Sequence, residues 1–389
     1  MHLERLALTD FRSYAEATLE LGPGVRVLVG PNAQGKTNLL ESIYYLATGS
    51  SHRVTSDVPL VRHGAEAGVI RAVARTGEDA RELSIELELR PRGRNRARLN
   101  GQPQPRFRDA IGALRAVLFA PEDLTLVRGD PSDRRRFLDD LLAQRRPAYA
   151  SARQEYDRVL RQRNQLLKDA RRRGGAPDTT LADWTEALVR TGAPLLAARV
   201  AVVHALAGPA NAAYAELLAG PPEPEAADDV TLAYELSSGR TVTGDPAGGV
   251  PHPAELADEL REALAACATE ERDRGLTLVG PHRDELALAV GELPAKGYAS
   301  HGESWSLALA LKLASREVLG EVGDEPIVLL DDVFAELDDQ RRQRLAERCA
   351  GFGQVIVTAA VDADVPLEGT RYGVRAGSVR ASSGGEEVA

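Results

Sequence analysis

The chain has 389 residues, of which 43% are hydrophobic and 27% charged. A chain of this length can form about two or three compact units, and its composition is too apolar for a disordered protein. The formal net charge of -10 argues, taken alone, against a general nucleic-acid-binding surface.

The cysteines and the apolar stretches of the chain indicate its cellular compartment. Cys267 and Cys349 lie far apart and match no metal-binding or CxxC spacing, so we expect reduced thiols. Residues 1–16 carry a charge every few positions, unlike a signal peptide, and we expect no later stretch of membrane-spanning length. These features predict a cytoplasmic protein with no membrane partner.

The first hundred residues have the pattern of strands and turns. Residues 3–9 and 15–21 precede a nearly continuous apolar run at 25–29, which is typical of a buried strand. Residues 68–76 and 81–89 alternate in polarity, and an Asn-Gly turn follows them, which predicts hairpins.

A glycine-rich loop follows the buried strand and opens a predicted helix that Gly49 ends. Its glycines let backbone N–H groups face phosphate oxygens, and the helix adds its positive end. Lys36 would reach the β- and γ-phosphates, and the Thr37 hydroxyl would bind Mg²⁺. An ordinary glycine-rich turn is the alternative, which the strand-to-helix context disfavours. The loop comprises Gly30, Pro31, Asn32, Ala33, Gln34, Gly35, Lys36 and Thr37.

The middle of the chain, from about residue 131 to 219, is rich in Arg and Ala and has helical periodicity. Between Arg128 and Arg173 there are 14 Lys and Arg against 7 Asp and Glu. These guanidinium groups could follow DNA phosphates, or they could form a solvated helix face. The candidates for DNA contact are Arg134, Arg135, Arg136, Arg161, Arg163, Arg171, Arg172 and Arg173.

A second cluster of arginines alternates along residues 90–98. Strand periodicity would place Arg90, Arg92, Arg94, Arg96 and Arg98 on one face of a hairpin. That face could meet DNA or water.

Regular structure resumes near residue 285 and looks like the second half of an α/β nucleotide-binding sheet. In 327–332 four apolar residues end in two carboxylates, an arrangement that holds Mg²⁺ and a hydrolytic water beside a γ-phosphate. Asp331 suits the metal and Asp332 suits the water. The alternative is a strand that runs into an acidic helix cap.

Ser300, Gly302 and Glu303 precede a long apolar-periodic helix, so exposed N–H groups at its start could hold another anion. Capping alone would also explain the serine. The order of P-loop, Ser-x-Gly-Glu helix and acidic strand resembles the ATP-binding-cassette (ABC) head. In that class the signature helix of one subunit caps the γ-phosphate bound by the other, so ATP joins a dimer.

Five blocks together resemble the RecF family of DNA replication and repair proteins, in the family's order. They are the P-loop region 30–53, "PEDLTLVRGDPSDRRRFLD" at 121–139, "TLVGPHRDEL" at 277–286, "YASHGES" at 298–304 and "PIVLLDDVFAELD" at 326–338. The resemblance implies an α/β, ABC-type P-loop ATPase head, like those of Rad50 and SMC proteins, with an inserted and mainly helical second lobe.

The resemblance also implies weak ATP hydrolysis, ATP-dependent homodimerisation and binding to gapped duplex or single-strand/double-strand junctions. It further implies cooperation with RecR and RecO in directing RecA to gaps, and it favours DNA contact for the basic segment. The expected organisation is a first head half at 1–120, the lobe at 121–275, a second head half at 276–375 and a flexible tail at 376–389.

Some residues depart from the family pattern. His301, Ser304 and Trp305 stand where glutamine-like residues are expected, and Thr358 replaces the switch histidine of many cassette ATPases, which predicts slow hydrolysis. The segment Phe11–Tyr14 either contacts adenine or completes the first strand.

Two further residues and two alternative functions are compatible with parts of this pattern. His282 and Asp284 favour a structural or nucleotide-sensing role over a zinc site, because no third ligand is near in sequence. The alternative functions are the ATPase subunit of a transporter and a nucleotide-dependent scaffold with negligible turnover.

Overall fold

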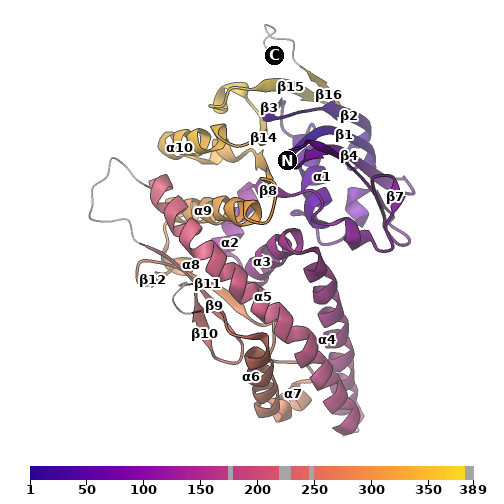
Figure 1. Cartoon of the computed structure of the whole chain (residues 1–389), viewed down its shortest axis with the longest axis vertical. Helices are drawn as coiled ribbons and strands as arrows, with labels where there is room; N and C mark the ends of the chain where they lie inside the picture. The colour runs from indigo at the N-terminus through magenta and orange to yellow at the C-terminus, as the bar shows by residue number, and fades with distance from the viewer. Residues whose placement is uncertain (174–177, 219–228, 245–248, 382–389) are drawn as a thin grey trace. The chain divides into compact units, whose positions relative to one another are not determined.

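The computed structural model describes residues 1–173, 178–218, 229–244 and 249–381. By its contacts the chain divides into two compact units, and each is described by itself (Figure 1). Unit 1 comprises Met1–Asp123, Ala215–Pro222 and Leu309–Ala389, and unit 2 comprises Leu124–Tyr214 and Glu223–Ala308.

Unit 1 contains a six-stranded sheet that draws its strands from both ends of the sequence. In the order β16-β15-β3-β14-β13-β8, all neighbouring strands are parallel except β16 and β15. All residues of β13 and β14 are buried, as continuous apolar runs predict for a sheet covered on both faces. The strands are β3 Gly24–Val29, β8 Ala116–Phe119, β13 Ile327–Asp331, β14 Gln354–Ala359, β15 Thr370–Arg375 and β16 Ser378–Ala381.

A second, antiparallel sheet of unit 1 has the order β2-β1-β4-β5-β6-β7. Its strands alternate in burial, with one face in the core and the other carrying charged side chains. The strands are β1 His2–Phe11, β2 Tyr14–Glu20, β4 Gly68–Thr76, β5 Arg81–Leu89, β6 Arg96–Leu99 and β7 Gln102–Pro103.

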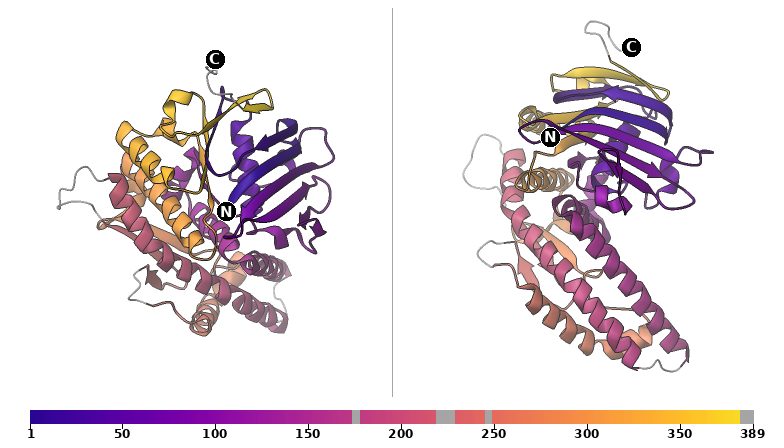
Figure 2. Two further views of the ribbon diagram at one scale, coloured as in Figure 1. Left: turned by 45° about the horizontal axis from the view of Figure 1, so that its top comes forward. Right: turned by 45° about the vertical axis from the view of Figure 1, so that its right-hand side comes forward.

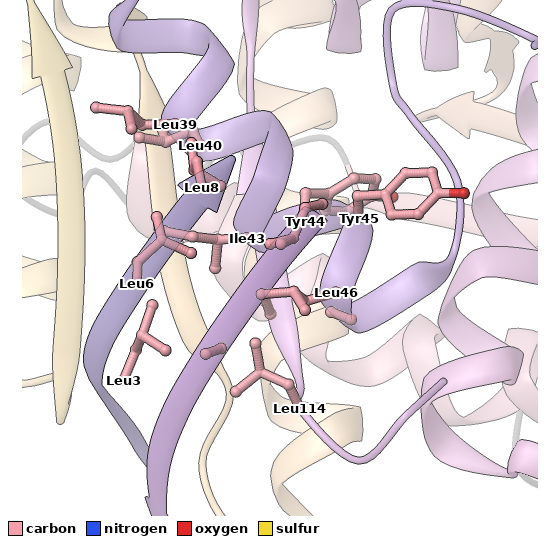
Figure 3. Packing of buried hydrophobic residues seen from close by; sticks show 14 of the residues in the cluster. Leu3, Leu6, Leu8, Leu39, Leu40, Ile43, Tyr44, Tyr45, Leu46 and Leu114 are labelled. Carbon is pink, nitrogen blue, oxygen red and sulfur yellow. The ribbon is translucent and has the colours of Figure 1, made fainter. Parts of the chain in front are cut away.

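Helix α1, Lys36–Thr48, packs its apolar side chains into the core of unit 1. Figure 3 shows Leu39, Leu40 and Ile43 of this helix close to Leu6 and Leu8 of β1. Truncating one such fully buried leucine to alanine typically costs about 2–5 kcal/mol. Because α1 begins at Lys36, this core also fixes the position of the loop that precedes it.

Unit 1 also contains α10, Asp339–Ala350, and most of α9, His301–Gly320, which continues from unit 2. The prediction of a flexible tail from residue 376 onward is wrong in part, because Ser378–Ala381 form strand β16, which pairs with β15. Residues 382–389 lie outside the described residues.

Unit 2 combines helices with a small sheet of order β10-β9-β11-β12. Helices α4 and α5 lie side by side in Figure 1 and in both views of Figure 2. The helices are α2 Leu124–Arg128, α3 Pro131–Arg145, α4 Pro147–Arg173, α5 Asp178–Leu218, α6 Pro253–Ala266, α7 Ala268–Arg274 and α8 Ala295–Tyr298. The strands are β9 Val230–Glu235, β10 Thr241–Thr243, β11 Glu285–Val290 and β12 Leu293–Pro294.

The predicted end of the inserted lobe at residue 275 is corrected by strand pairing. Strand β11 pairs along its whole length with β9, and β12 pairs with β11, so residues 276–308 belong to unit 2. Only the part of α9 from Leu309 onward belongs to unit 1.

Helix α5 is apolar and long enough, by length and composition, to cross a membrane, contrary to the sequence expectation. Half of its most apolar stretch is buried within the protein. Its Arg199 is fully buried and donates hydrogen bonds to Asp139, to the Tyr234 hydroxyl and to the Pro281 carbonyl. A charged residue paired in this way is typical of the core helix of a folded unit.

Of the two roles predicted for His282 and Asp284, structural or nucleotide-sensing, the structural one agrees with their contacts in unit 2. Asp284 accepts hydrogen bonds from the Tyr234 hydroxyl and from the backbone and side chain of Ser237. His282 Nδ1 lies 2.7 Å from the Tyr156 hydroxyl. Within the described ranges, no group of three His, Cys, Asp or Glu residues could hold a metal ion.

Candidate nucleotide-binding site

The loop between β3 and α1 closes tightly around two glycines. A Cβ atom on Gly30 would lie 2.2 Å from the Val374 carbonyl oxygen, and one on Gly35 would lie 2.7 Å from the Tyr14 hydroxyl. Gly35 also has a φ of 109°, which disfavours any side chain. The backbone path of the loop therefore depends on glycine at both positions.

Lys36 folds back over this loop. Its side chain is buried, and its Nζ donates to the Gly30 carbonyl at 2.8 Å and to the Pro31 carbonyl at 3.2 Å. Among the described residues, no side chain caps the start of α1 and no acidic residue occupies its first turn. The first N–H groups of α1 and the Lys36 ammonium thus form a cradle suited to an anion.

The acidic strand end lies directly beside this cradle. Asp331 is the last residue of β13 and is 4% exposed. The Thr37 hydroxyl donates to Asp331 Oδ1 at 3.0 Å, so the two predicted metal ligands, 294 positions apart, are in contact. Burial raises the pKa of Asp331 to about 6, and the negative charge of Asp332 acts in the same direction.

This pair of oxygen donors suits Mg²⁺. A hydroxyl and a carboxylate at the start of a phosphate-binding helix are the hard oxygen ligands that this ion takes together with substrate phosphates. The residues present therefore fit a Mg²⁺–nucleotide complex, with Thr37 and Asp331 as the protein ligands.

Thr358, predicted only as a substitute for a switch histidine, has a definite place here. It ends β14 beside Asp331 in the parallel register, and its hydroxyl donates to Asp331 Oδ1 at 2.6 Å. The hydroxyl oxygen of Thr358 also accepts the N–H of Asp332, at 3.0 Å. Asp332 itself has a φ of 51°, a left-handed conformation that is uncommon outside glycine.

The segment Phe11–Tyr14 completes strands rather than presenting aromatic rings to a ligand. Phe11 and Tyr14 are fully buried in the core. The turn between them still contacts the loop, because Asn38 donates to the Ser13 hydroxyl at 2.9 Å and the Tyr14 hydroxyl donates to the Gly35 carbonyl at 3.1 Å.

The predicted signature residues lie in unit 2 and form a capping box. The Ser300 N–H donates to a Glu303 carboxylate oxygen at 2.7 Å, and the Glu303 N–H donates to the Ser300 hydroxyl at 3.3 Å. Two departures from the family pattern, Ser304 and Trp305, are buried. The local fold thus explains the cap, and a role toward a second subunit stays a prediction.

Two of the predicted DNA-binding arginines are buried and form ion pairs within unit 2. Arg134 is 5% exposed and bonds both carboxylate oxygens of Glu285, at 2.7 and 2.8 Å. Arg163 is 2% exposed and pairs with Glu271 at 2.6 Å. Arg135 is partly buried and donates to the Asp284 carbonyl at 2.7 Å. These contacts assign Arg134 and Arg163 to the core of unit 2 and count against direct phosphate contact by either side chain.

The remaining predicted arginines are more accessible. Arg161 and Arg172 are exposed, Arg171 is exposed and donates to the Arg274 carbonyl at 3.0 Å, and Arg136 lies 3.8 Å from Asp140. Lys168 is also exposed, and its spacing from Arg161 and Arg172 places all three on one face of α4. The side chain of Arg173 lies outside the described residues.

A parallel sheet with a glycine-rich loop before α1 and an acidic strand end beside it defines an ABC-type P-loop ATPase head. The family model described as RecF/RecN/SMC N terminal domain matches residues 2–377. An SMC head domain from Pyrococcus furiosus, 18% identical with a TM-score of 0.51 over 98% of this chain and 96% of that one, shares this fold.

Two relatives cover nearly the whole chain. The DNA replication and repair protein RecF of Streptomyces avermitilis is 53% identical over 97% of this chain and 99% of its own. That of Frankia alni is 54% identical over 98% and 100%. A solved structure of the recombination mediator protein RecF-ATP in the RecFOR pathway matches 98% of each chain with 28% identity and a TM-score of 0.87. The chain belongs to the RecF family of DNA replication and repair proteins.

Proposed function

We propose that this chain is a cytoplasmic, ATP-dependent DNA-binding protein of replication and recombinational gap repair, with weak ATPase activity. The observation that carries the proposal is the convergence of Lys36, Thr37 and Asp331 at one edge of the parallel sheet, with Thr37 and Asp331 3.0 Å apart. The family relatives, named as DNA replication and repair proteins, support DNA rather than a transported solute as the partner.

In this proposal the loop 30–37 binds the phosphates of ATP. Lys36 would exchange its two carbonyl partners for phosphate oxygens, and the loop N–H groups would donate to the same phosphates. Thr37 and Asp331 would hold Mg²⁺, which when bound neutralises charge on the transferred phosphoryl group. Asp332 would orient the attacking water and take up its proton.

The signature residues Ser300, Gly302 and Glu303 would act across a homodimer. Their place at the start of α9 supports an anion contact, because the N-terminus of a helix favours negative charge. Each γ-phosphate would then be held by the loop of one subunit and the signature of the other. ATP binding would close the dimer on DNA, and hydrolysis would reset it.

The exposed cations of α4 would contact DNA phosphates, with gapped duplex or a single-strand/double-strand junction as the target. Of the arginines that the sequence predicts to contact DNA, Arg161 and Arg172 support this part of the proposal. Lys168 lies on the same face of α4. The association of a related solved structure with the RecFOR pathway supports RecR and RecO as partners, with RecA loaded onto the gap.

Solution mass measured by light scattering tests the proposal. We expect a monomer without nucleotide, a dimer with ATP and Mg²⁺, and a larger complex when gapped duplex is added. Lys36→Ala should remain monomeric, because it loses a phosphate ligand, and Asp332→Asn should retain ATP and accumulate the dimer. A parental protein that binds ATP and stays monomeric, with and without DNA, would contradict the proposal.

A further inference from the structure

A hollow of about 570 Å³ lies on unit 1, over the hairpin that joins β5 to β6 and the segment after β7. Its lining combines cations with an apolar wall. The cations are Arg90, Arg94, Arg96 and Arg98, the anions Glu86 and Glu88, and the wall is formed by Pro103, Pro105 and Phe107.

Of the arginines in this hollow, Arg96 and Arg98 have only distant acidic partners, whereas Arg90 is closely paired. Glu88 pairs closely with Arg90, at 2.6 Å, and lies 3.8 Å from Arg96 across the strand. Arg98 lies 3.9 Å from Glu86, whose close partner is Arg71. The side chains of Arg96 and Arg98 are 67% and 58% exposed, so most of their N–H donors remain available to a ligand.

The backbone that carries these arginines is anchored. The side chain of Asn95 accepts the N–H of Arg90 at 2.9 Å and donates to Asp57 at 2.7 Å, which ties the hairpin loop to the body of unit 1. Cations on an anchored loop lose less conformational freedom when they bind a ligand.

We propose that this hollow binds single-stranded DNA, with phosphates on Arg94, Arg96 and Arg98 and a base against Phe107. The inference rests on the proposed function and adds to it a site on unit 1 that is distinct from the α4 cations of unit 2. A positively charged groove beside an aromatic ring is how proteins hold single strands, since every base has a face that can stack. An acidic peptide would use the cations and leave the wall of Pro105 and Phe107 without a matched partner.

The test compares the triple variant Arg94→Ala, Arg96→Ala, Arg98→Ala with Arg5→Ala in the full chain. Arg5 is a matched control, because it is 56% exposed, pairs with Glu20 on the same sheet and does not line the hollow. The triple variant should bind an oligothymidylate about tenfold more weakly at low salt, and its log–log salt slope should flatten by about 0.7 for each lost contact. Blunt duplex should bind as in the parental protein, within about twofold.

Photocross-linking provides a second measurement that does not depend on affinity. An oligothymidylate that carries 5-iodouracil should cross-link to the peptide containing Phe107, and the triple variant should lose that cross-link. Equal binding of oligothymidylate by the triple variant and Arg5→Ala would overturn the site while leaving DNA binding by α4 intact. Displacement of the oligonucleotide by polyglutamate of the same charge at equal concentration would also overturn it in favour of a peptide site. A parental protein that binds neither DNA would overturn the proposed function as well.

Discussion

The hydroxyl of Thr358 donates a 2.6 Å hydrogen bond to Oδ1 of Asp331, the same oxygen that accepts the Thr37 hydroxyl. Asp331 is thereby held from two sides, by the neighbouring parallel strand and by the helix that follows the phosphate-binding loop. Thr358 also accepts the N–H of Asp332, so one side chain orients both residues of the acidic pair.

This relationship predicts that Thr358→Val slows hydrolysis more than it weakens ATP binding. Valine keeps the shape of threonine but leaves a buried carboxylate oxygen and the Asp332 N–H without the hydroxyl, a loss of about 1–3 kcal/mol. We expect kcat to fall roughly tenfold, while the Kd for a fluorescent ATP analogue changes about twofold at most. Thr358→Ser retains the hydroxyl and should restore kcat. Equal rates for the valine and serine variants would remove Thr358 from this positioning role.

Two arginines only two positions apart on α4 should differ strongly in how much their replacement destabilises the protein. Arg163→Ala leaves Glu271 buried without its partner and should destabilise the protein by about 3–5 kcal/mol. Arg161→Ala removes an exposed side chain and should change stability by less than about 0.5 kcal/mol. Urea denaturation measures both effects.

If the exposed cations of α4 contact DNA, they should contribute to the salt dependence of DNA binding. Replacing Arg161, Lys168 and Arg172 with alanine should flatten the log–log salt slope for duplex DNA by about 0.9 for each lost phosphate contact. An unchanged slope in a protein that remains folded would return these side chains to the solvated-face interpretation.

The arrangement of the candidate nucleotide site was largely predictable from sequence, and the burial of individual arginines was not. Lys36, Thr37 and Asp331 belong to motifs whose chemistry dictates their spacing, so their convergence follows from the strand order of the sheet. Composition could not separate buried from exposed arginines, but periodicity contained a signal. Arg163 shares a helical face with Tyr156, Val159, Leu167 and Ala170, all of which are buried, and an arginine on that stripe must be paired inside the unit.

Residues 276–308 belong to unit 2, which could not be predicted from their position in the sequence. The sequence predicts regular structure from about residue 285, where β11 lies, but whether that strand joins the parallel sheet or another one depends on pairing between residues far apart in sequence. Its partner is β9, and the register Leu286 to Tyr234 brings Asp284 close to the Tyr234 hydroxyl. A pattern of alternating polarity specifies that a strand exists and leaves its partner undetermined.

His282 predicts how unit 2 responds to acid. Burial lowers the pKa of His282 to about 4, from an ordinary value of 6.5, and the unfolded chain therefore binds a proton first as the pH falls. The stability that neutral His282 provides is present above pH 6.5 and is lost between pH 6.5 and about 4, by at most about 1.4 kcal/mol for each pH unit. His282→Gln cannot take up the proton, so its thermal midpoint should fall less than that of the parental protein over this interval. Parallel pH curves for the two proteins would contradict this assignment.

The composite site across a dimer can be tested by mixing two inactive proteins. A Lys36→Ala subunit has a defective loop and an intact signature, and a Ser300→Arg subunit has an intact loop and a signature blocked by a bulky cation. Each alone should be nearly inactive. In a mixed dimer one site combines both defects, and the other joins the intact loop of one subunit to the intact signature of the other. With random pairing, hydrolysis should recover to about a quarter of the parental rate if the sites act independently in a symmetric dimer.

The capping box at the start of α9 requires a control in this experiment. Ser300→Arg removes the hydroxyl that accepts the Glu303 N–H, and Ser300→Ala removes the same cap without adding bulk or charge. A lost cap typically costs about 1 kcal/mol of stability, so both variants should lose similar stability while only arginine blocks the site. Mixtures should also be measured for ATP-dependent dimerisation, because closure that requires two ATP molecules would lower the recovery. Mixtures that dimerise normally yet regain no hydrolysis would show that Ser300 serves only as the cap of its own helix.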